Sequence, residues 1–369
     1  MGISGMLRIV IFALAALAAT GTVLSLLTSY RWYIRMWDFP RLGLMVIALI
    51  ALVLAIPTLS GWARAMVVAA MLLVVGWQGF RIYPYTPLAK TEVAQAVINK
   101  ENCLSAFSFN VLQTNRNYQR TIDLIDREDP DIVLLLETDE QWEAALKPVI
   151  DRYPHRLSAP LPNLYGLIFL TRLPVEDAEI TWLIDTETPS IFATISTGAG
   201  AKFRYIGLHP RPPQPGENTE KRDAEIAIAA RHAKLTDLPV LAMGDFNDVA
   251  WSRTSQMFKR IGGYLDPRVG RGLYATFPAN LPGLRWPLDH LFMSPDFTLV
   301  QMKVLENVGS DHLPVAATVC IAPRAAKVLN EEPEAPDAAD RKDMILSIRD
   351  GKKAAIEEGT ASGEKAPKP

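Results

Sequence analysis

Three short segments of this chain, far apart in the sequence, each place metal-binding or proton-transferring side chains at the end of an apolar stretch. Short continuous aliphatic stretches are typical of buried strands. Strands that deliver carboxylate, amide and imidazole groups to one end of a sheet can build a hydrolytic metal site. The sequence therefore favours a fold in which three distant strand ends meet. The segments are Asp131-Ile-Val-Leu-Leu-Leu-Glu137, Gly244-Asp245-Phe246-Asn247 and Gly309-Ser310-Asp311-His312.

The first part of the chain, residues 1–81, holds most of the long apolar runs and almost no acid. Three runs, at 7–27, 42–59 and 62–80, are long enough to cross a bilayer as helices. Trp62 and Trp77 would anchor the third and shortest run at the membrane interfaces. We predict a membrane anchor of about three transmembrane helices. A cleaved signal peptide followed by a helical hairpin is the alternative.

The charges between the predicted spans bear on the side of the membrane that the rest of the chain occupies. The first loop carries Arg31, Arg35 and Arg41, whereas the second loop offers only Arg64. The positive-inside rule would place the first loop, and everything after the third span, in the cytoplasm. The margin is only a few charges.

The rest of the chain divides into a connector at 82–102, a domain at 103–322 and a tail at 323–369. The tail is rich in Ala, Glu, Lys and Pro and has no aromatic residue, so we expect it to be disordered. Within the domain, many strands alternate with helices, which predicts two packed sheets flanked by helices. Helices are expected at 117–128 and 217–235. Strands are expected at 104–110, 131–136, 166–170, 191–195, 203–208, 239–243, 291–294 and 313–320.

The charge balance limits the kinds of partner that the domain can bind. Acidic residues slightly outnumber basic ones between Ile82 and Ala325, and the whole chain has a formal net charge of −2. A protein with a broad DNA-binding face would be clearly basic, although a local basic groove stays open. The chain has no Gly-x-Ser-x-Gly elbow, no phosphate-binding loop with a lysine and no zinc-binding Cys/His spacing.

The strand-end motifs, in this order, resemble the endonuclease/exonuclease/phosphatase superfamily, which has the deoxyribonuclease I-like fold. The resemblance spans about 104–319 and is carried by Asn110, Glu137, His209, Gly244-Asp-Phe-Asn247, Asp289 and Ser310-Asp-His312. It implies an α/β (α+β) fold, a four-layer sandwich of two mixed sheets flanked by helices. The predicted transmembrane helices lie outside it and are similar to those of membrane-anchored bacterial members.

The resemblance also implies a role for each motif residue in hydrolysis of a phosphate ester. Asp245 would position or deprotonate the attacking water, Asn247 would hold a phosphate oxygen, and His312 would donate to a non-bridging oxygen. Asp289 would pair with His312, and His209 would be a second active-site histidine. The metal, Mg²⁺ or else Mn²⁺, would be held by Glu137, Asn110 and Asp311.

A loop just before Asp289 mixes arginines with aromatic residues. Arg271 and Arg285 are our candidates for substrate binding, because arginines interleaved with Tyr274 and Trp286 suit stacked bases or phosphate-bearing lipid headgroups. A packed loop with a solvated arginine fringe explains the pattern equally well. Among the other histidines, we expect His290 to be structural and His155 and His232 to lie on the surface.

The chain has two cysteines, Cys103 and Cys320. In the fold that the resemblance implies, the first and last strands are antiparallel neighbours, so both cysteines fall at the end opposite the active site. They are candidates for a disulfide, which would favour an exported domain. Two buried free thiols are the alternative. Export is slightly preferred over the cytoplasmic placement that the arginines indicate.

These observations predict a multi-pass protein of a bacterial-type inner membrane that hydrolyses phosphodiesters with a divalent metal by in-line attack of water. Its partners would be the lipid bilayer and a substrate that is nucleic acid or phospholipid; no protein partner is inferred. A nuclease is the first hypothesis. The alternative is a lipid or small-molecule phosphodiesterase of sphingomyelinase or inositol-phosphatase type. A binding protein without catalysis is a third possibility.

Overall fold

The computed structural model describes residues 3–96 and 102–363, which form two compact units. The helical unit comprises residues 3–89 together with 213–219, and the sheet unit comprises the remaining described residues. Residues 97–101 of the predicted connector 82–102, and the last six residues of the chain, lie outside the described parts.

The helical unit contains three long helices where the three apolar runs were predicted. They are α1 (Ile3–Leu24), α3 (Arg41–Thr58) and α4 (Gly61–Ile82), with the short elements α2 (Trp32–Arg35), η1 (Met36–Asp38) and η2 (Tyr83–Tyr85). All three are long and apolar enough to cross a membrane. Small residues such as Ala18, Ala48 and Ala51 are fully buried between them. Close packing of small residues is how helices associate in lipid.

A buried ionic network lies at one end of the helical unit. Asp38 accepts from Arg35 and Arg41, each at 3.1 Å. Arg41 also donates to Gln78, whose amide donates to Thr22 at 2.9 Å. Two of the three arginines of the first predicted loop are therefore engaged with an acid and shielded from solvent.

The sheet unit is built on two mixed sheets. The six-stranded sheet has the order β10-β11-β1-β2-β4-β3, and the five-stranded sheet has the order β5-β6-β7-β8-β9. Among the strand pairs of the described residues, β1/β2 and β7/β8 are parallel and the others are antiparallel. The first sheet contains β1 (Cys103–Asn110), β2 (Ile132–Leu136), β3 (His155–Ala159), β4 (Leu167–Thr171), β10 (Phe297–Val304) and β11 (Val315–Ile321). The second contains β5 (Val175–Thr181), β6 (Ser190–Ser196), β7 (Lys202–Leu208), β8 (Val240–Asp245) and β9 (Asp289–Met293).

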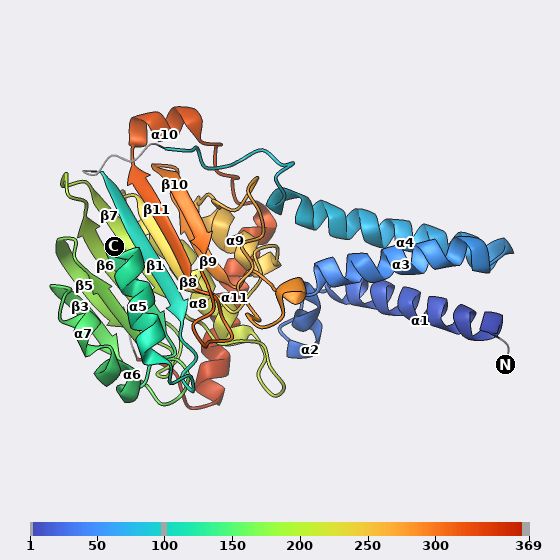
Figure 1. Ribbon diagram of the computed structural model, residues 1–369, viewed down its shortest axis with the longest axis horizontal. Helices are drawn as coiled ribbons and strands as arrows, with labels where there is room; N and C mark the ends of the chain where they lie inside the picture. The colour runs from blue at the N-terminus through green and yellow to red at the C-terminus, as the bar shows by residue number, and fades with distance from the viewer. Residues whose placement is uncertain (1–2, 97–101, 364–369) are drawn as a thin grey trace. The chain divides into compact units, whose positions relative to one another are not determined.

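The two sheets pack face to face and helices cover their outer faces (Figure 1). The core between the sheets is aliphatic and aromatic, and includes Leu134, Phe169 and Tyr205. One outer layer is formed by α5 (Tyr118–Glu128), α6 (Glu140–Ala145) and α7 (Lys147–Ile150). The other is formed by α8 (Glu220–His232), α9 (Arg253–Gly262) and α11 (Ala338–Glu357). The predicted four-layer sandwich is confirmed.

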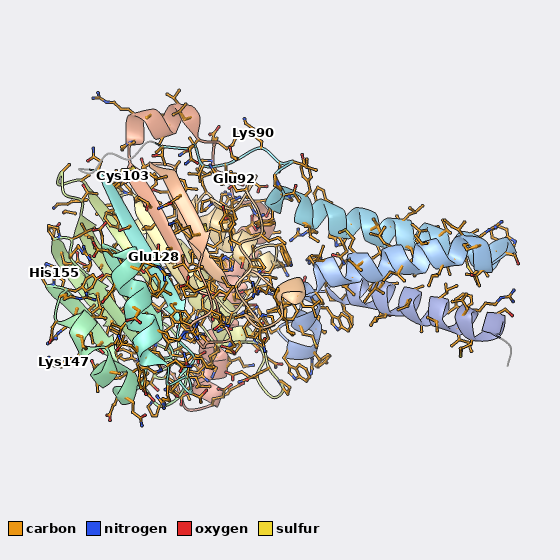
Figure 2. The ribbon with its side chains drawn as sticks, in the orientation of Figure 1. Lys90, Glu92, Cys103, Glu128, Lys147 and His155 are labelled. Atoms are coloured by element: carbon orange, nitrogen blue, oxygen red, sulfur yellow. A yellow bond between two sulfur atoms is a disulfide. The ribbon has the colours of Figure 1, made fainter. Side chains whose placement is uncertain are left out.

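The first and last strands are neighbours, as the resemblance implied. Cys103 lies directly opposite Cys320 in the antiparallel β1/β11 pair, and the two are joined by a disulfide with a Cα–Cα distance of 3.9 Å. Figure 2 labels Cys103 at the start of β1, the end of the strand opposite Asn110. The two cysteines therefore lie far from the strand ends that carry the motifs.

The prediction of a disordered tail is wrong for most of the tail. Residues 323–329 form α10, and α11 packs along α8. A glycine allows a close approach of the two helices: a Cβ on Gly351 would lie 2.3 Å from the Cβ of Ala224. Small residues bury little apolar area but let two helices approach closely, so composition alone misjudged this segment. His232 is also buried rather than on the surface.

Candidate active site

Strand register brings the predicted residues to one end of both sheets. In the parallel β1/β2 pair, Asn110 lies beside Leu136, the residue before Glu137. In the parallel β7/β8 pair, Leu208 lies beside Gly244. His209 and Asp245, the next residues of the two chains, therefore lie side by side at this end of the sheet. Asp289 opens β9 directly opposite Asp245. His312 lies just before β11.

Asn110 links the two sheets at this end. Its side-chain amide donates to Glu137 Oε1 at 2.8 Å and to Asp245 Oδ2 at 3.1 Å. Glu137 Oε2 accepts from the backbone of Gln113 at 3.3 Å. Burial raises the pKa of Glu137, and the hydrogen bonds from Asn110 and Gln113 and the charge of His312 only partly oppose it. A metal ion would reverse that shift.

Asp245 lies at the centre of the site and is fully buried. Its Oδ1 accepts from the backbone amide of Asn247 at 2.8 Å, and its Oδ2 lies 3.4 Å from His312 Nε2. Burial raises the pKa of Asp245 to about 7, against the opposing effect of the His312 charge. A carboxyl with this pKa can exchange a proton near neutral pH.

His312 forms the proton-holding end of the same cluster. Its Nδ1 lies 2.8 Å from Asp289 Oδ2, so Asp289 fixes the orientation of the ring. Burial alone lowers the pKa of His312, but the two carboxylates of Asp245 and Asp289 outweigh it and raise the pKa to about 10. The ring is therefore an imidazolium that can donate from Nε2.

His209 and Asn247 complete the predicted set with less direct contacts. His209 Nε2 lies 3.9 Å from Asp245 Oδ2, but burial lowers the pKa of His209 to about 3, so this is not an ion pair. The His209 ring contacts Tyr165, with 5.5 Å between ring centroids. Asn247 donates to the Pro210 carbonyl at 2.9 Å and stays partly exposed.

Unusual backbone conformations gather around the site. Glu137 and Asn247 have φ of 60° and 49°, values that cost energy for residues other than glycine. Gly244 has a φ of 139°, and a Cβ there would lie 2.0 Å from the Leu208 carbonyl oxygen. Only glycine fits between β7 and Asp245. Such strain is typical of sites whose geometry is fixed by the surrounding fold.

Two sets of residues could hold a metal. Ligand atoms of Asp245, Asp289 and His312 lie within 4.8 Å of one another. In this set, His312 is protonated and faces both aspartates, and a protonated imidazole cannot coordinate a metal. Glu137 suits a hard cation better, because it is partly exposed and lies close enough to Asp311 to feel its charge, so two carboxylates could share one ion.

The two predicted substrate arginines form hydrogen bonds with backbone carbonyls. Arg271 donates to the main-chain carbonyls of Val93 and Pro267, at 2.6 and 3.1 Å. Arg285 donates to the carbonyl of Ala279 in its own loop. Both guanidinium groups hydrogen-bond to backbone carbonyls rather than standing free as a solvated fringe, and their role in substrate binding stays a prediction. The sequence could not distinguish these orientations.

Several supporting residues were not assigned a role from the sequence. Ser310 Oγ donates to the Asn110 carbonyl at 2.7 Å and accepts from the His312 amide, which fixes the His312 segment on β1. Arg222 donates to the Asn247 carbonyl at 2.9 Å. Ser310 was part of a quoted motif, whereas nothing in the sequence around Arg222 singled it out. His290 is structural, as expected, and contacts Arg268 and the Asp248 carbonyl.

A comparison with models of protein families shows to which family the chain belongs. The model of the Endonuclease/Exonuclease/phosphatase family matches residues 107–312, more than half of the chain. The chain belongs to this family. Proteins of the family hydrolyse phosphoester bonds, and this chain is a hydrolase of that class. Family enzymes depend on divalent metals, and the cluster of acids and histidines described above is consistent with that chemistry.

Solved structures are similar in fold to this family member. The human Nocturnin catalytic domain with bound sulfate is 16% identical, with a TM-score of 0.49, and the match covers 61% of this chain and 97% of that one. D. rerio TDP2 complexed with a single-strand DNA product is 17% identical, with a TM-score of 0.48 and coverage of 59% and 98%. A Bacteroides thetaiotaomicron mannosyl-6-phosphatase is 19% identical, with a TM-score of 0.46 and coverage of 58% and 99%. The search of curated proteins found no match.

Proposed function

We propose that this family member is a membrane-anchored, Mg²⁺-dependent phosphodiesterase that cleaves its substrate by in-line attack of water. The observation that carries the proposal is the position of Asp245. It lies within 3.4 Å of the His312 imidazolium and within 3.1 Å of the amide that also binds Glu137. A proton acceptor, a proton donor and a carboxylate suited to a metal therefore share one strand end.

The metal would be held by Glu137, with Asp311 and the Asn110 side-chain oxygen as further ligands. Mg²⁺ prefers oxygen ligands, binds through one or two carboxylates and keeps several waters. When bound, it would neutralise charge on the phosphate and lower the pKa of nearby water. Mn²⁺ has the same preference for oxygen and should substitute.

The residues of the chain would divide the remaining work. Asp245, with a pKa of about 7, would orient the attacking water and accept its proton. His312 would donate from Nε2 to a non-bridging phosphate oxygen, and Asp289 would hold the ring in place. Asn247 would bind a second phosphate oxygen. His209, which is neutral, would line the same pocket and donate a hydrogen bond.

The three long helices of the helical unit would anchor the enzyme in the membrane. The Cys103–Cys320 disulfide favours placement of the sheet unit in an oxidising compartment, outside the cytoplasm. The opposing argument, the arginines of the first loop, loses weight because Arg35 and Arg41 are paired with Asp38. We therefore keep the exported orientation in a bacterial-type inner membrane.

The direct test is hydrolysis by the full-length protein in detergent. We expect cleavage of bis(p-nitrophenyl) phosphate with Mg²⁺ or Mn²⁺ and none with EDTA. A parallel panel of single-stranded DNA, RNA and phospholipid would rank the natural substrate classes. Glu137→Gln should raise the Mg²⁺ concentration needed for half-maximal activity, whereas Glu143→Gln, which is half-buried on α6, should not. Equal activity in EDTA would refute the metal-dependent mechanism.

A further inference from the structure

A loop with an apolar tip lies beside the catalytic histidine. Phe277 and Trp286 exchange backbone hydrogen bonds at its base, and the Phe277 ring lies 4.8 Å from the His312 ring. The Ala279 amide also donates to the Asp311 carbonyl at 2.7 Å, so the loop is attached to the motif itself. Its tip is the short helix η4 (Pro282–Leu284); Leu281, just before the helix, is 49% exposed, and Leu284, at its end, is 59% exposed.

A second loop on the same site also exposes a leucine. Leu164 is 45% exposed and has a φ of 72°, a conformation that glycine or asparagine adopts at lower cost. The next residue, Tyr165, contacts the ring of His209. Gln113 stabilises this loop by donating to the Leu161 carbonyl. Its leucine is therefore presented by a backbone anchored to active-site residues.

We propose that these leucines form a membrane-binding rim, Leu164, Leu281 and Leu284, and that the scissile phosphoester belongs to a membrane lipid. The inference rests on the proposed function and names its substrate class. Hydrolysis would form a bond from a water oxygen to phosphorus and break the ester P–O bond. One proton of the water would pass to Asp245 and the leaving alkoxide would take a proton to become an alcohol.

The chemistry of the rim favours lipid over nucleic acid. Nucleic acids are bound by cationic grooves and by aromatic or arginine platforms. Here the tips are aliphatic, and the two nearby arginines, Arg285 in the tip loop and Arg271 before it, donate to backbone carbonyls. Leucine side chains gain free energy when they leave water for the acyl boundary of a bilayer.

The proposed membrane anchor would also bring a bilayer close to the rim. The last long helix ends at Ile82, and Gln95 already bridges to β10 at Leu299. About a dozen residues lie between these points, and they span at most about 45 Å when extended. With the three helices in a bilayer, as proposed above, a connector of this length confines the sheet unit to the neighbourhood of the bilayer, which raises the local concentration of lipid for the three leucines.

Substitution of the rim tests the substrate class. The full-length protein would be reconstituted into vesicles of phosphatidylcholine and phosphatidylglycerol, and release of phosphorylated headgroup or alcohol followed by mass spectrometry. In Leu281→Gln/Leu284→Gln we expect the ratio of lipid hydrolysis to bis(p-nitrophenyl) phosphate hydrolysis to fall at least tenfold. The matched control is Val328→Gln/Leu329→Gln on α10, where both side chains are more exposed than the tip leucines. It should leave the ratio unchanged.

A second measurement locates the rim without catalysis. An environment-sensitive fluorophore on Leu284→Cys should be quenched by nitroxide-labelled lipids, and one on Leu329→Cys should not. Absence of quenching at position 284, an unchanged ratio in the tip variant, or cleavage of DNA or RNA in preference to lipid would each overturn the inference. Failure to hydrolyse the soluble ester, lipid and nucleic acid alike with Mg²⁺ or Mn²⁺ would overturn the proposed function, and the substrate assignment with it.

Discussion

Two fully buried aspartates of the sheet unit, Asp245 and Asp266, differ in the partner that faces them. Asp266 is held by two hydrogen bonds from the side chain of Arg268, both at 2.8 Å. Burial alone raises the pKa of Asp266, but Arg268 outweighs it and the pKa is lowered. For Asp245, burial outweighs the His312 charge and the pKa rises to about 7. An arginine fixes the charge of a buried carboxylate, whereas a histidine leaves it able to exchange a proton.

The largest effect should come from removing the exchangeable carboxylate. Asp245→Asn should lower kcat by about 10²–10⁴-fold, because a general base is lost while the shape of the side chain is kept. The midpoint of urea unfolding should stay the same or rise. Asp237→Asn, on the surface, is the control for both measurements. Full activity in Asp245→Asn with Mg²⁺ would show that another group accepts the proton.

Breaking the Asp266–Arg268 pair should have the opposite effect: the stability should fall and the activity per folded molecule should stay the same. Arg268→Met leaves Asp266 buried without its partner, and such a change typically costs about 3–5 kcal/mol of unfolding free energy. Arg127→Met removes a cation that pairs with Glu306 in solvent and should leave the urea midpoint unchanged. If Arg268→Met lost activity per folded molecule while unfolding normally, the Asp266–Arg268 pair would belong to the catalytic machinery and the contrast would fail.

The same comparison extends to the disulfide end of the sheets, which lies opposite the candidate site residues. Cys103→Ser/Cys320→Ser should lower the unfolding free energy by about 2–4 kcal/mol, the usual range for loss of a disulfide. kcat at temperatures below the unfolding transition should not change, since the cysteines lie at the end of β1 opposite Asn110. Alkylation of both thiols in native membranes without reductant would remove the argument for export.

The smallest effect should come from a buried histidine that faces a cation. His232 accepts from Arg204, and burial, helped by Arg204 and opposed by Asp177, lowers the pKa of His232 to about 4. The unfolded chain binds this proton near pH 6.5, so stability is complete above that pH and is lost as the pH falls toward 4. A loss of roughly 1–2 kcal/mol is expected at pH 5.5. His232→Gln keeps an acceptor for Arg204 and should flatten the pH dependence; an equally steep curve would place the titration elsewhere.

The sequence predicted the sheet architecture and the end of the sheets at which the motifs meet. Polar residues such as Glu137 and Asp245 directly follow apolar stretches that are readily recognised as buried strands. It did not predict α11, whose contact with α8 depends on the absence of side chains at Gly351 rather than on apolar area. It proposed Arg271 and Arg285 for substrate binding from residue type alone, and it could not predict the carbonyls that these side chains contact. The direction of a long flexible side chain depends on carbonyls that only the folded loop supplies.

The position of β1 within its sheet has a consequence for the order in which the protein can assemble. β1 is an inner strand, flanked by β2 on one side and by β11 on the other. β2 follows it closely along the chain, whereas β11 begins only at Val315. During synthesis or translocation, one edge of β1 therefore remains open until almost the whole domain has emerged. A truncated or stalled chain would present that edge to other chains, so this protein should depend on holding factors until its last strand arrives.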